Sequence, residues 1–324
     1  MAKKKKSQQR RRLHLPIPAR SVSSIEDPSL EGKASTLAGR VSSDNRYKNS
    51  MAISFEAILQ SRTFKFLIGD DEVPFTVHEA AFADLSPELD TLMRGRKDMK
   101  MNESLEGKAK WEDVDPDTFM RFTQFAYTGD YSVPKMILGM GEEIPPPAPE
   151  PEPGLEIYGN NNQYWTETQR TFHTLNYTLH PKSRFAHTCE PSVEGGPNEE
   201  ENIAAILLLH VSLYALAHRQ GVTSLQNLAL SKLHQTLQML PPSDVGRDKR
   251  VQDLATLLRY TYSDGITGDY VVEGKMDDLR ELVVQYVVLN AQATAHDRDF
   301  LELIEGGAIV RDIWKLAAPG VVVS

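Results

Sequence analysis

The chain has 324 residues, enough for one large or two ordinary domains, and 40% of them are hydrophobic, slightly below the usual share of a globular protein. Its single cysteine, Cys189, excludes an intramolecular disulfide framework and fits a reducing compartment. No apolar run approaches the roughly 18–20 residues of a membrane helix, and the basic N-terminus lacks the apolar centre of a secretory signal. We therefore expect a protein of the nucleus and/or cytoplasm with no membrane contact.

Charge is distributed unevenly along the chain. The formal net charge is -9, yet residues 1–50 contain the basic runs KKKK at 3–6 and RRR at 10–12. This segment is polar and aperiodic, so we expect a disordered basic tail. It has three interpretations: a nuclear import signal, a nucleic-acid patch or a solubilising extension. The acidic remainder repels phosphates, so only the tail is expected to bind nucleic acid.

The first predicted element is the apolar segment MAISFEAILQS at 51–61. Its apolar residues follow near-helical spacing: Ile53, Phe55, Ile58 and Leu59. This pattern predicts either an extra packing helix or a dimerising arm.

A β-hairpin is predicted over 63–78, with the turn GDDE at its centre. Apolar residues alternate on both sides of the turn, and a period of two places them on one face of the sheet: Phe64, Phe66, Ile68, Phe75 and Val77. Two short helices then cover that face. Phe82 and Leu85 lie on the first, while Ser86 caps the second and Pro87 occupies its first position. The second helix ends at Gly95 and has an apolar stripe of Leu89, Leu92 and Met93.

A third strand and an aromatic helix follow. The strand is expected within SLEGKAKWEDVD at 104–115, with Trp111 and Val114 buried. Asp115 is a good N-cap for the helix, and Gly129 supplies its left-handed stop. The helix carries its apolar residues at helical spacing, so we expect them in the core: Phe119, Phe122, Phe125 and Ala126.

Residues 135–201 change in character. The run IPPPAPEPEPG is proline-rich, and the segments around it are turn-rich or acidic, so we predict a mostly disordered insertion. The prolines act either as a spacer or as a ligand for a proline-recognition domain. His173, His180 and His187 recur every seventh residue, and Cys189 follows. These are either zinc ligands or a coincidental polar loop, because metal sites favour closer pairs.

Helical periodicity resumes after the insertion. Helices are predicted over 203–221 and 223–240, the second with a Thr/Ser cap. Two more amphipathic helices are predicted over 251–265 and 277–295, and two short ones over 297–317.

Three motifs in this order carry a family resemblance: FTVHEAAFADLSPELDTLMRG, WEDVDPDTFMRFTQFAYTGDY and LYALAHRQGVTSLQNLALSKLHQTL. Together they resemble the BTB/POZ domain, and FAYTGDY with the later LLRYTY is similar to filamentous-fungal members. The likeness covers 62–134 and 202–318. It implies an α+β BTB/POZ fold, a small sheet covered by helices. Its first part would be 51–134, its helical completion 202–240 and a C-terminal helical extension 241–318.

The resemblance implies a non-catalytic protein–protein interaction module. Members associate with themselves or with another BTB protein, and a subset bridges substrates to cullin ubiquitin-ligase scaffolds. No cofactor or catalytic residue is implied, and the sequence contains no P-loop, dinucleotide fingerprint or Gly-x-Ser-x-Gly. The implied protein-binding positions are His78, Ser86, Tyr127, Gly129, Tyr131, His218 and Arg219.

Two departures from the family pattern bear on its partners. Thr63 stands where many animal members carry an Asp that supports their dimers, and AHRQ at 217–220 replaces the usual Ala-Asp-Lys-Tyr. The alternatives to simple association are a substrate adaptor for a cullin ligase and a nuclear regulator whose basic tail contacts nucleic acid.

Overall fold

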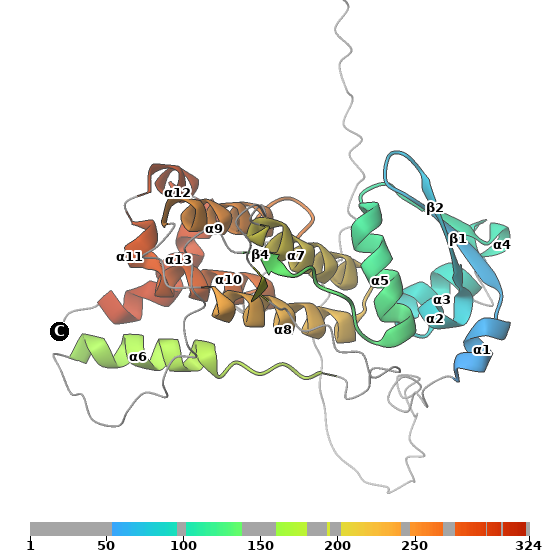
Figure 1. Ribbon diagram of the computed structural model, residues 1–324, viewed down its shortest axis with the longest axis horizontal. Helices are drawn as coiled ribbons and strands as arrows, with labels where there is room; N and C mark the ends of the chain where they lie inside the picture. The colour runs from blue at the N-terminus through green and yellow to red at the C-terminus, as the bar shows by residue number, and fades with distance from the viewer. Residues whose placement is uncertain are drawn as a thin grey trace, which may run out of the picture. The chain divides into compact units, whose positions relative to one another are not determined.

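The computed structural model describes residues 54–95, 102–137, 160–179, 193–194, 202–240, 247–267, 276–295, 297–305 and 307–321. These residues form a mixed α+β architecture, with a small three-stranded sheet and helices over most of the rest (Figure 1). The predicted basic tail, 1–50, lies outside the described residues. The expectation of an α+β protein is confirmed.

Helix α1, Phe55–Gln60, occupies the first predicted apolar segment. Ser54 caps it, its hydroxyl accepting a hydrogen bond from the Ala57 amide at 3.2 Å. Ile58 is fully buried and the helix packs against α2, whereas Phe55 and Leu59 are 48% and 51% exposed. The segment is therefore a packing helix on one side, and its other side leaves the arm interpretation open.

The sheet has the order β2-β1-β3. Strands β1, Thr63–Ile68, and β2, Val73–His78, pair antiparallel as predicted, with Phe64 opposite Val77 and Phe66 opposite Phe75. Strand β3, Lys108–Trp111, runs parallel to β1. This register places the alternating aromatic residues of β1 on the covered face.

Short helices cover the sheet: α2, Glu79–Ala83, α3, Pro87–Arg94, and α4, Asn102–Glu106. The predicted cap of α3 is confirmed, since the Ser86 hydroxyl accepts from the Leu89 amide at 3.1 Å. Two boundaries were wrong. Leu85 follows the end of α2. The predicted third strand begins in helix α4, and β3 ends at Trp111, so Val114 lies in the turn after the strand, where it is buried.

Helix α5, Pro116–Thr128, is the aromatic helix. The Asp115 carboxylate accepts from the Thr118 amide at 2.9 Å, and Gly129 ends the helix at a φ of 81°. Phe119 and Phe122 are fully buried, and Phe119 lies 5.1 Å from the ring of Phe66 on β1. Tilted and edge-on rings at such distances are the favoured aromatic geometry. The prediction that these rings form the core is confirmed.

The insertion 135–201 contains more order than predicted. Strand β4, Met136–Ile137, pairs parallel with β5, Val193–Glu194. Beside this pair the side chain of Asn202 accepts from the Ile137 amide at 2.9 Å and donates to the Lys135 carbonyl at 2.8 Å. Its amide thereby extends the two-residue ladder.

Helix α6, Asn160–His173, also lies within the insertion, so the expectation of disorder was wrong there. The polar run before Tyr164 hides a stripe at helical spacing, made of Tyr164, Trp165, Thr168 and Phe172. Phe172 is 2% exposed and supplies the tertiary contact that the composition did not reveal.

The remaining helices form the helical part of the fold: α7, Ile203–Arg219, α8, Thr223–Met239, α9, Arg247–Thr261, α10, Asp278–Leu289, α11, Ala291–Thr294, α12, Arg298–Leu303, and α13, Gly307–Val321. The predicted helix 277–295 is broken at Asn290, and α9 begins before residue 251. The Thr/Ser cap of α8 was wrong, because Val222 occupies the cap position. No helix among the described residues is both long and apolar enough to cross a membrane.

Candidate protein-binding surfaces

His78 and Tyr127 bind each other inside the fold. The Tyr127 hydroxyl accepts from the His78 backbone amide at 2.8 Å and lies 2.8 Å from Nδ1 of the same residue. The second hydrogen bond joins the hydroxyl and Nδ1, and the tautomer of the imidazole sets which of the two atoms donates. The pair joins the end of β2 to the last turn of α5, so both residues stabilise the fold.

Ser86 and Gly129 also have local structural roles. Ser86 is 1% exposed and its hydroxyl is used as a helix cap. Gly129 occupies the left-handed position that ends α5. The predicted motif is therefore formed by residues that build the fold, and Ser86 offers no surface to a partner.

Tyr131 is fully buried, so its predicted role as a partner contact is wrong. Its hydroxyl lies 2.8 Å from Nδ1 of His210 on α7. Burial raises the pKa of the Tyr131 phenol well above its ordinary value, which keeps the group neutral. In this chain Tyr131 thus forms a contact between the end of α5 and the helical part.

A buried lysine extends this contact. Lys232 of α8 is 6% exposed, and its ammonium donates to the Tyr131 carbonyl at 2.7 Å and pairs with the Asp130 carboxylate at 2.7 Å. The same nitrogen lies 4.5 Å above the centre of the Tyr131 ring. In the sequence, Lys232 lies among apolar residues at helical spacing. Since lysine is almost never fully buried unless it is paired, this position indicated a buried acidic partner.

His210 completes the network. Its Nε2 lies 3.3 Å from the Thr236 hydroxyl, and its pKa is lowered to about 3, chiefly by burial and secondly by the charge of Lys232. The imidazole is therefore neutral at physiological pH. Three elements, the end of α5, α7 and α8, are joined by these hydrogen bonds.

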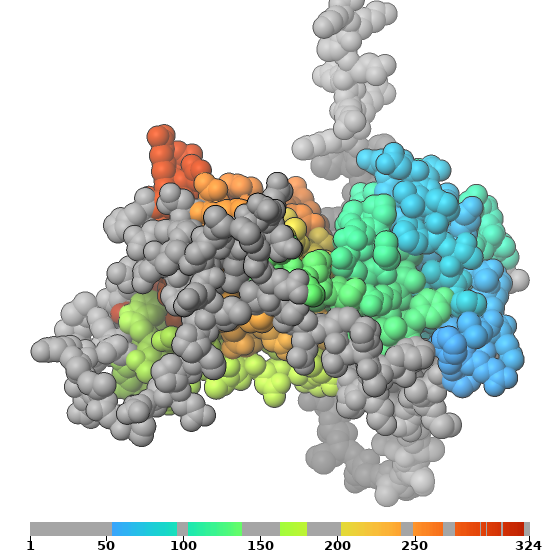
Figure 2. All heavy atoms as spheres, viewed as in Figure 1, coloured from blue at the N-terminus to red at the C-terminus, as the bar shows by residue number. Residues whose placement is uncertain are grey.

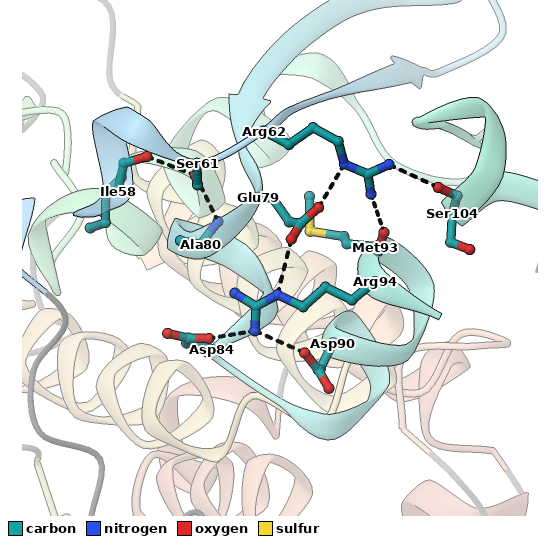
Figure 3. A network of polar contacts seen from close by, with 10 residues as sticks. All are labelled: Ile58, Ser61, Arg62, Glu79, Ala80, Asp84, Asp90, Met93, Arg94 and Ser104. Carbon is teal, nitrogen blue, oxygen red and sulfur yellow. Dashed lines mark hydrogen bonds and ion pairs between the residues drawn. The ribbon is translucent and has the colours of Figure 1, made fainter. Parts of the chain in front are cut away.

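A second polar network fixes the sheet-side helices (Figure 3). Arg62 pairs with Glu79 at 2.8 Å and donates to the carbonyls of Met93 and Ser104 at 2.5 and 3.0 Å. It thus connects the start of β1 to α2, α3 and α4. Its side chain is 47% exposed, so the network has a geometric role and each ion pair contributes little energy.

Arg94 extends the network from the end of α3. It pairs with Glu79 at 3.0 Å and with Asp84 and Asp90 at 2.9 Å each. Beside it the Ser61 hydroxyl donates to the Ile58 carbonyl at 2.7 Å and accepts from the Ala80 amide at 3.2 Å. The end of α1 is thereby tied to α2 (Figure 3).

His218 and Arg219, at the end of α7, remain exposed as a binding role requires. The Gln226 side-chain amide donates to Nδ1 of His218 at 2.9 Å, and the His218 ring stacks on Tyr214 with the ring centres 6.3 Å apart. Arg219 lines a cleft of about 480 Å³, whose other walls include Asp113, Asp115, Ser212, Tyr260 and Asp264. The cleft combines carboxylates, hydroxyls and a guanidinium with an aromatic wall, a composition suited to a polar protein segment.

The proposed zinc ligands are only partly within the described residues. His173 ends α6, is exposed and lies 3.5 Å from the Gln238 amide nitrogen, whereas His180, His187 and Cys189 are outside the described ranges. Across the described ranges, no group of three or more His, Cys, Asp or Glu side chains is placed to hold a metal ion.

No family model, curated protein or solved structure matches this chain. The BTB/POZ resemblance therefore stays a prediction.

Proposed function

We propose that the protein is a non-catalytic protein–protein interaction module of BTB/POZ type that associates with itself or with a related chain. The order of the motifs and the arrangement of hairpin, parallel third strand and aromatic helix support this proposal. Three of the predicted binding residues, His78, Tyr127 and Tyr131, form hydrogen bonds inside the fold, so we expect association to use the outer surface.

The observation that carries the proposal is the two-sided character of α1. Ile58 anchors the helix in the core, and Leu59 is 51% exposed with Phe55 at 48% one turn before it. Residues four apart lie on the same side of a helix, so these two side chains form one outward apolar strip. A stable interface built around it would bury about 1,200–2,000 Å².

Light scattering on the full chain tests this proposal. The Phe55→Ser/Leu59→Ser variant is expected to shift the mass toward the monomer at concentrations where the wild type self-associates. A variant that begins at Arg62 is a poorer test, because it lacks Ile58, which is part of the core, and Ser61, which is hydrogen-bonded to α2. Met120→Ser is the matched control, since Met120 is 56% exposed on α5.

Mixing with a related chain extends the same test to a heteromer. If the double variant keeps the wild-type mass across the whole concentration range and still captures the related chain, association does not use α1 and the proposal fails.

A second candidate is a substrate adaptor for a cullin scaffold, which Arg219 favours. This exposed guanidinium lines a cleft at the helix end that, in the resembled family, lies on the partner-facing side. A pull-down with the scaffold's N-terminal region should lose signal with Arg219→Ala and keep it with Arg298→Ala, an exposed arginine on α12. Tyr131→Ala is unsuitable because it disrupts the buried network.

The nuclear-regulator alternative depends on the basic tail, which is outside the described residues. It requires nucleic-acid binding that weakens steeply with salt.

A further inference from the structure

Helix α6 is held on the helical part through two aromatic anchors. At the first, the Tyr164 hydroxyl donates to the Leu316 carbonyl of α13, and the rings of Tyr164 and Trp165 lie over Gly320. A Cβ atom on Gly320 would come within 2.5 Å of Tyr164 Cδ1 and 2.7 Å of Trp165 Cζ2. The packed aromatic rings cannot move away from an added Cβ atom as the end of a flexible side chain could, so this contact requires glycine at position 320.

The second anchor is Phe172. Its ring, 2% exposed, stands edge-on to His234 of α8 at 4.8 Å and lies 5.7 Å from Tyr286 of α10. Tyr177, beyond the end of α6, approaches His234 to 5.8 Å. The Thr178 carbonyl then accepts from the Asn227 side chain at 3.0 Å. The segment 160–179 thus lies on three helices through a few separate contacts.

The surface of the helical part beneath α6 contains one buried polar atom without a hydrogen-bond partner among the described residues. His234 is 4% exposed and is hydrogen-bonded to the Phe172 carbonyl, and its Nε2 has no hydrogen-bond partner among the described residues. A carbonyl only accepts, so Nδ1 carries the proton and Nε2 is a lone-pair acceptor without a donor. Burial lowers the pKa of His234, which favours this neutral form.

The rest of α6 contributes little to its attachment. Most of its described side chains are exposed, and the helix contributes the yellow-green atoms to the molecular surface in Figure 2. A helix of 14 residues is marginal in water by itself, so its helical form depends on the seat. In the sequence, residues 138–159 stand between β4 and α6, and residues 180–192 stand between the segment 160–179 and β5.

We propose that the surface beneath α6, formed by His234, Tyr286, Leu316 and Gly320 and here called the α6 seat, is a docking site for an aromatic amphipathic helix of a different protein. Helix α6 fills it in cis. The partner helix carries two adjacent rings and a third two turns later, together with a hydroxyl or amide donor for His234 Nε2.

The unpaired Nε2 of His234 distinguishes the two helices that could occupy the α6 seat, α6 of a second copy and a helix of a different protein. The α6 of a second copy would leave Nε2 without a donor just as the cis helix does, so exchange between copies gains no new bond. A helix that supplies the donor gains one, because an unmet buried acceptor is costly. This inference goes beyond the association proposed above, which uses α1.

Fluorescence anisotropy tests the α6 seat with a dye-labelled peptide of residues 160–179 and the full-length protein. Phe172→Ala opens the seat by weakening α6 in cis, and it is expected to bind the peptide at least tenfold more tightly than the wild type. The reason is that a tethered competitor acts at an effective concentration of about millimolar. Thr171→Ala, an exposed change in the same turn, should behave as the wild type.

Two further variants complete the test. Gly320→Ala, added to the opened variant, is expected to remove peptide binding, whereas Val310→Ala on the exposed side of α13 should not. Trp165→Ala provides a second opened variant if circular dichroism shows that Phe172→Ala unfolds the helical part. Equal binding of the peptide by all variants, or binding by none, would overturn the docking site.

The donor requirement is tested with peptides in which single positions between 168 and 176, other than 172, are replaced by glutamine. At least one is expected to bind the opened variant tenfold more tightly than the parent peptide. If none does, the stated partner chemistry is wrong. Concentration-dependent dimers of the wild type that disappear with Gly320→Ala would identify a second copy as the occupant and overturn the assignment.

Discussion

The aromatic core under the sheet and the seat of α6 both depend on rings, but they hold their elements in different ways. Phe119 touches the rings of Phe66, Phe75 and Phe82 at 4.9–6.1 Å. Phe172 has two ring contacts from other helices and one unsatisfied imidazole nitrogen beside it. The first arrangement is mutually reinforcing, whereas the second can come apart locally.

The largest expected effect tests this contrast directly. Phe119→Ala should lower the free energy of unfolding by about 3–5 kcal/mol, the usual cost of removing a buried ring. Phe172→Ala should lower the global value by less than about 1 kcal/mol, because α6 detaches before the rest unfolds. Urea denaturation measures the global value, and hydrogen exchange measures opening of α6. Equal global losses would remove the distinction.

The buried lysine gives the next effect. Lys232→Met removes a buried ammonium from the Asp130 carboxylate and the Tyr131 carbonyl and should lower the free energy of unfolding by about 3 kcal/mol. Lys110 pairs with Glu72 and Glu112 at the surface, so Lys110→Met is the control and should not measurably change the free energy of unfolding. Urea denaturation compares them. Similar costs for the two lysines would contradict the assigned burial.

The pH dependence sharpens the role of His210. Its pKa is lowered to about 3 in the folded state, so the unfolded chain binds a proton that the folded chain does not as pH falls below about 6.5. The His210 contribution to stability is therefore full above that pH and decreases toward pH 3. His210→Gln should reduce the slope of the unfolding free energy against pH across this window, by the amount that corresponds to at most one bound proton. An unchanged slope would show that another group controls it.

The smallest effect concerns the polar network of Figure 3. Glu79→Gln removes the acceptor charge shared by Arg62 and Arg94 and should cost about 1–2 kcal/mol, because both arginines are partly exposed. Thermal unfolding would detect the change. Glu106→Gln, which affects one exposed pair, should have no measurable effect. If Glu79→Gln lowered the free energy of unfolding more than Lys232→Met does, the ranking of the two networks would be reversed.

The same contrast explains which features could be predicted from sequence. The hairpin, the capped α3 and the aromatic helix follow from local signals: alternation, Ser86 with Pro87, and Asp115 with Gly129. These signals depend on neighbours in the chain, and the structure confirms them. The polar composition around helix α6 concealed it, and its aromatic stripe gains meaning only from a glycine on α13 and a histidine on α8.

The binding residues show the limit of motif-based prediction. Tyr131 was expected at a partner surface because of its place in the motif, yet its distant partners His210 and Lys232 bury it. Those partners lie far along the chain and could be inferred only from their odd placement on apolar helix faces. Arg219, which was expected to bind a partner, is exposed, and the cleft that it lines was not foreseen.

The Asn202 bridge has a consequence for the length of the chain between β4 and β5. This side-chain amide bonds both Lys135 and Ile137, so the start of α7 is joined to β4 by contacts that do not involve the residues between Ile137 and α6. Closing a longer loop costs only about 0.6 kcal/mol for each doubling of its length. A reporter domain inserted between Ile137 and α6 is therefore expected to leave the hydrogen bonds of Asn202 intact.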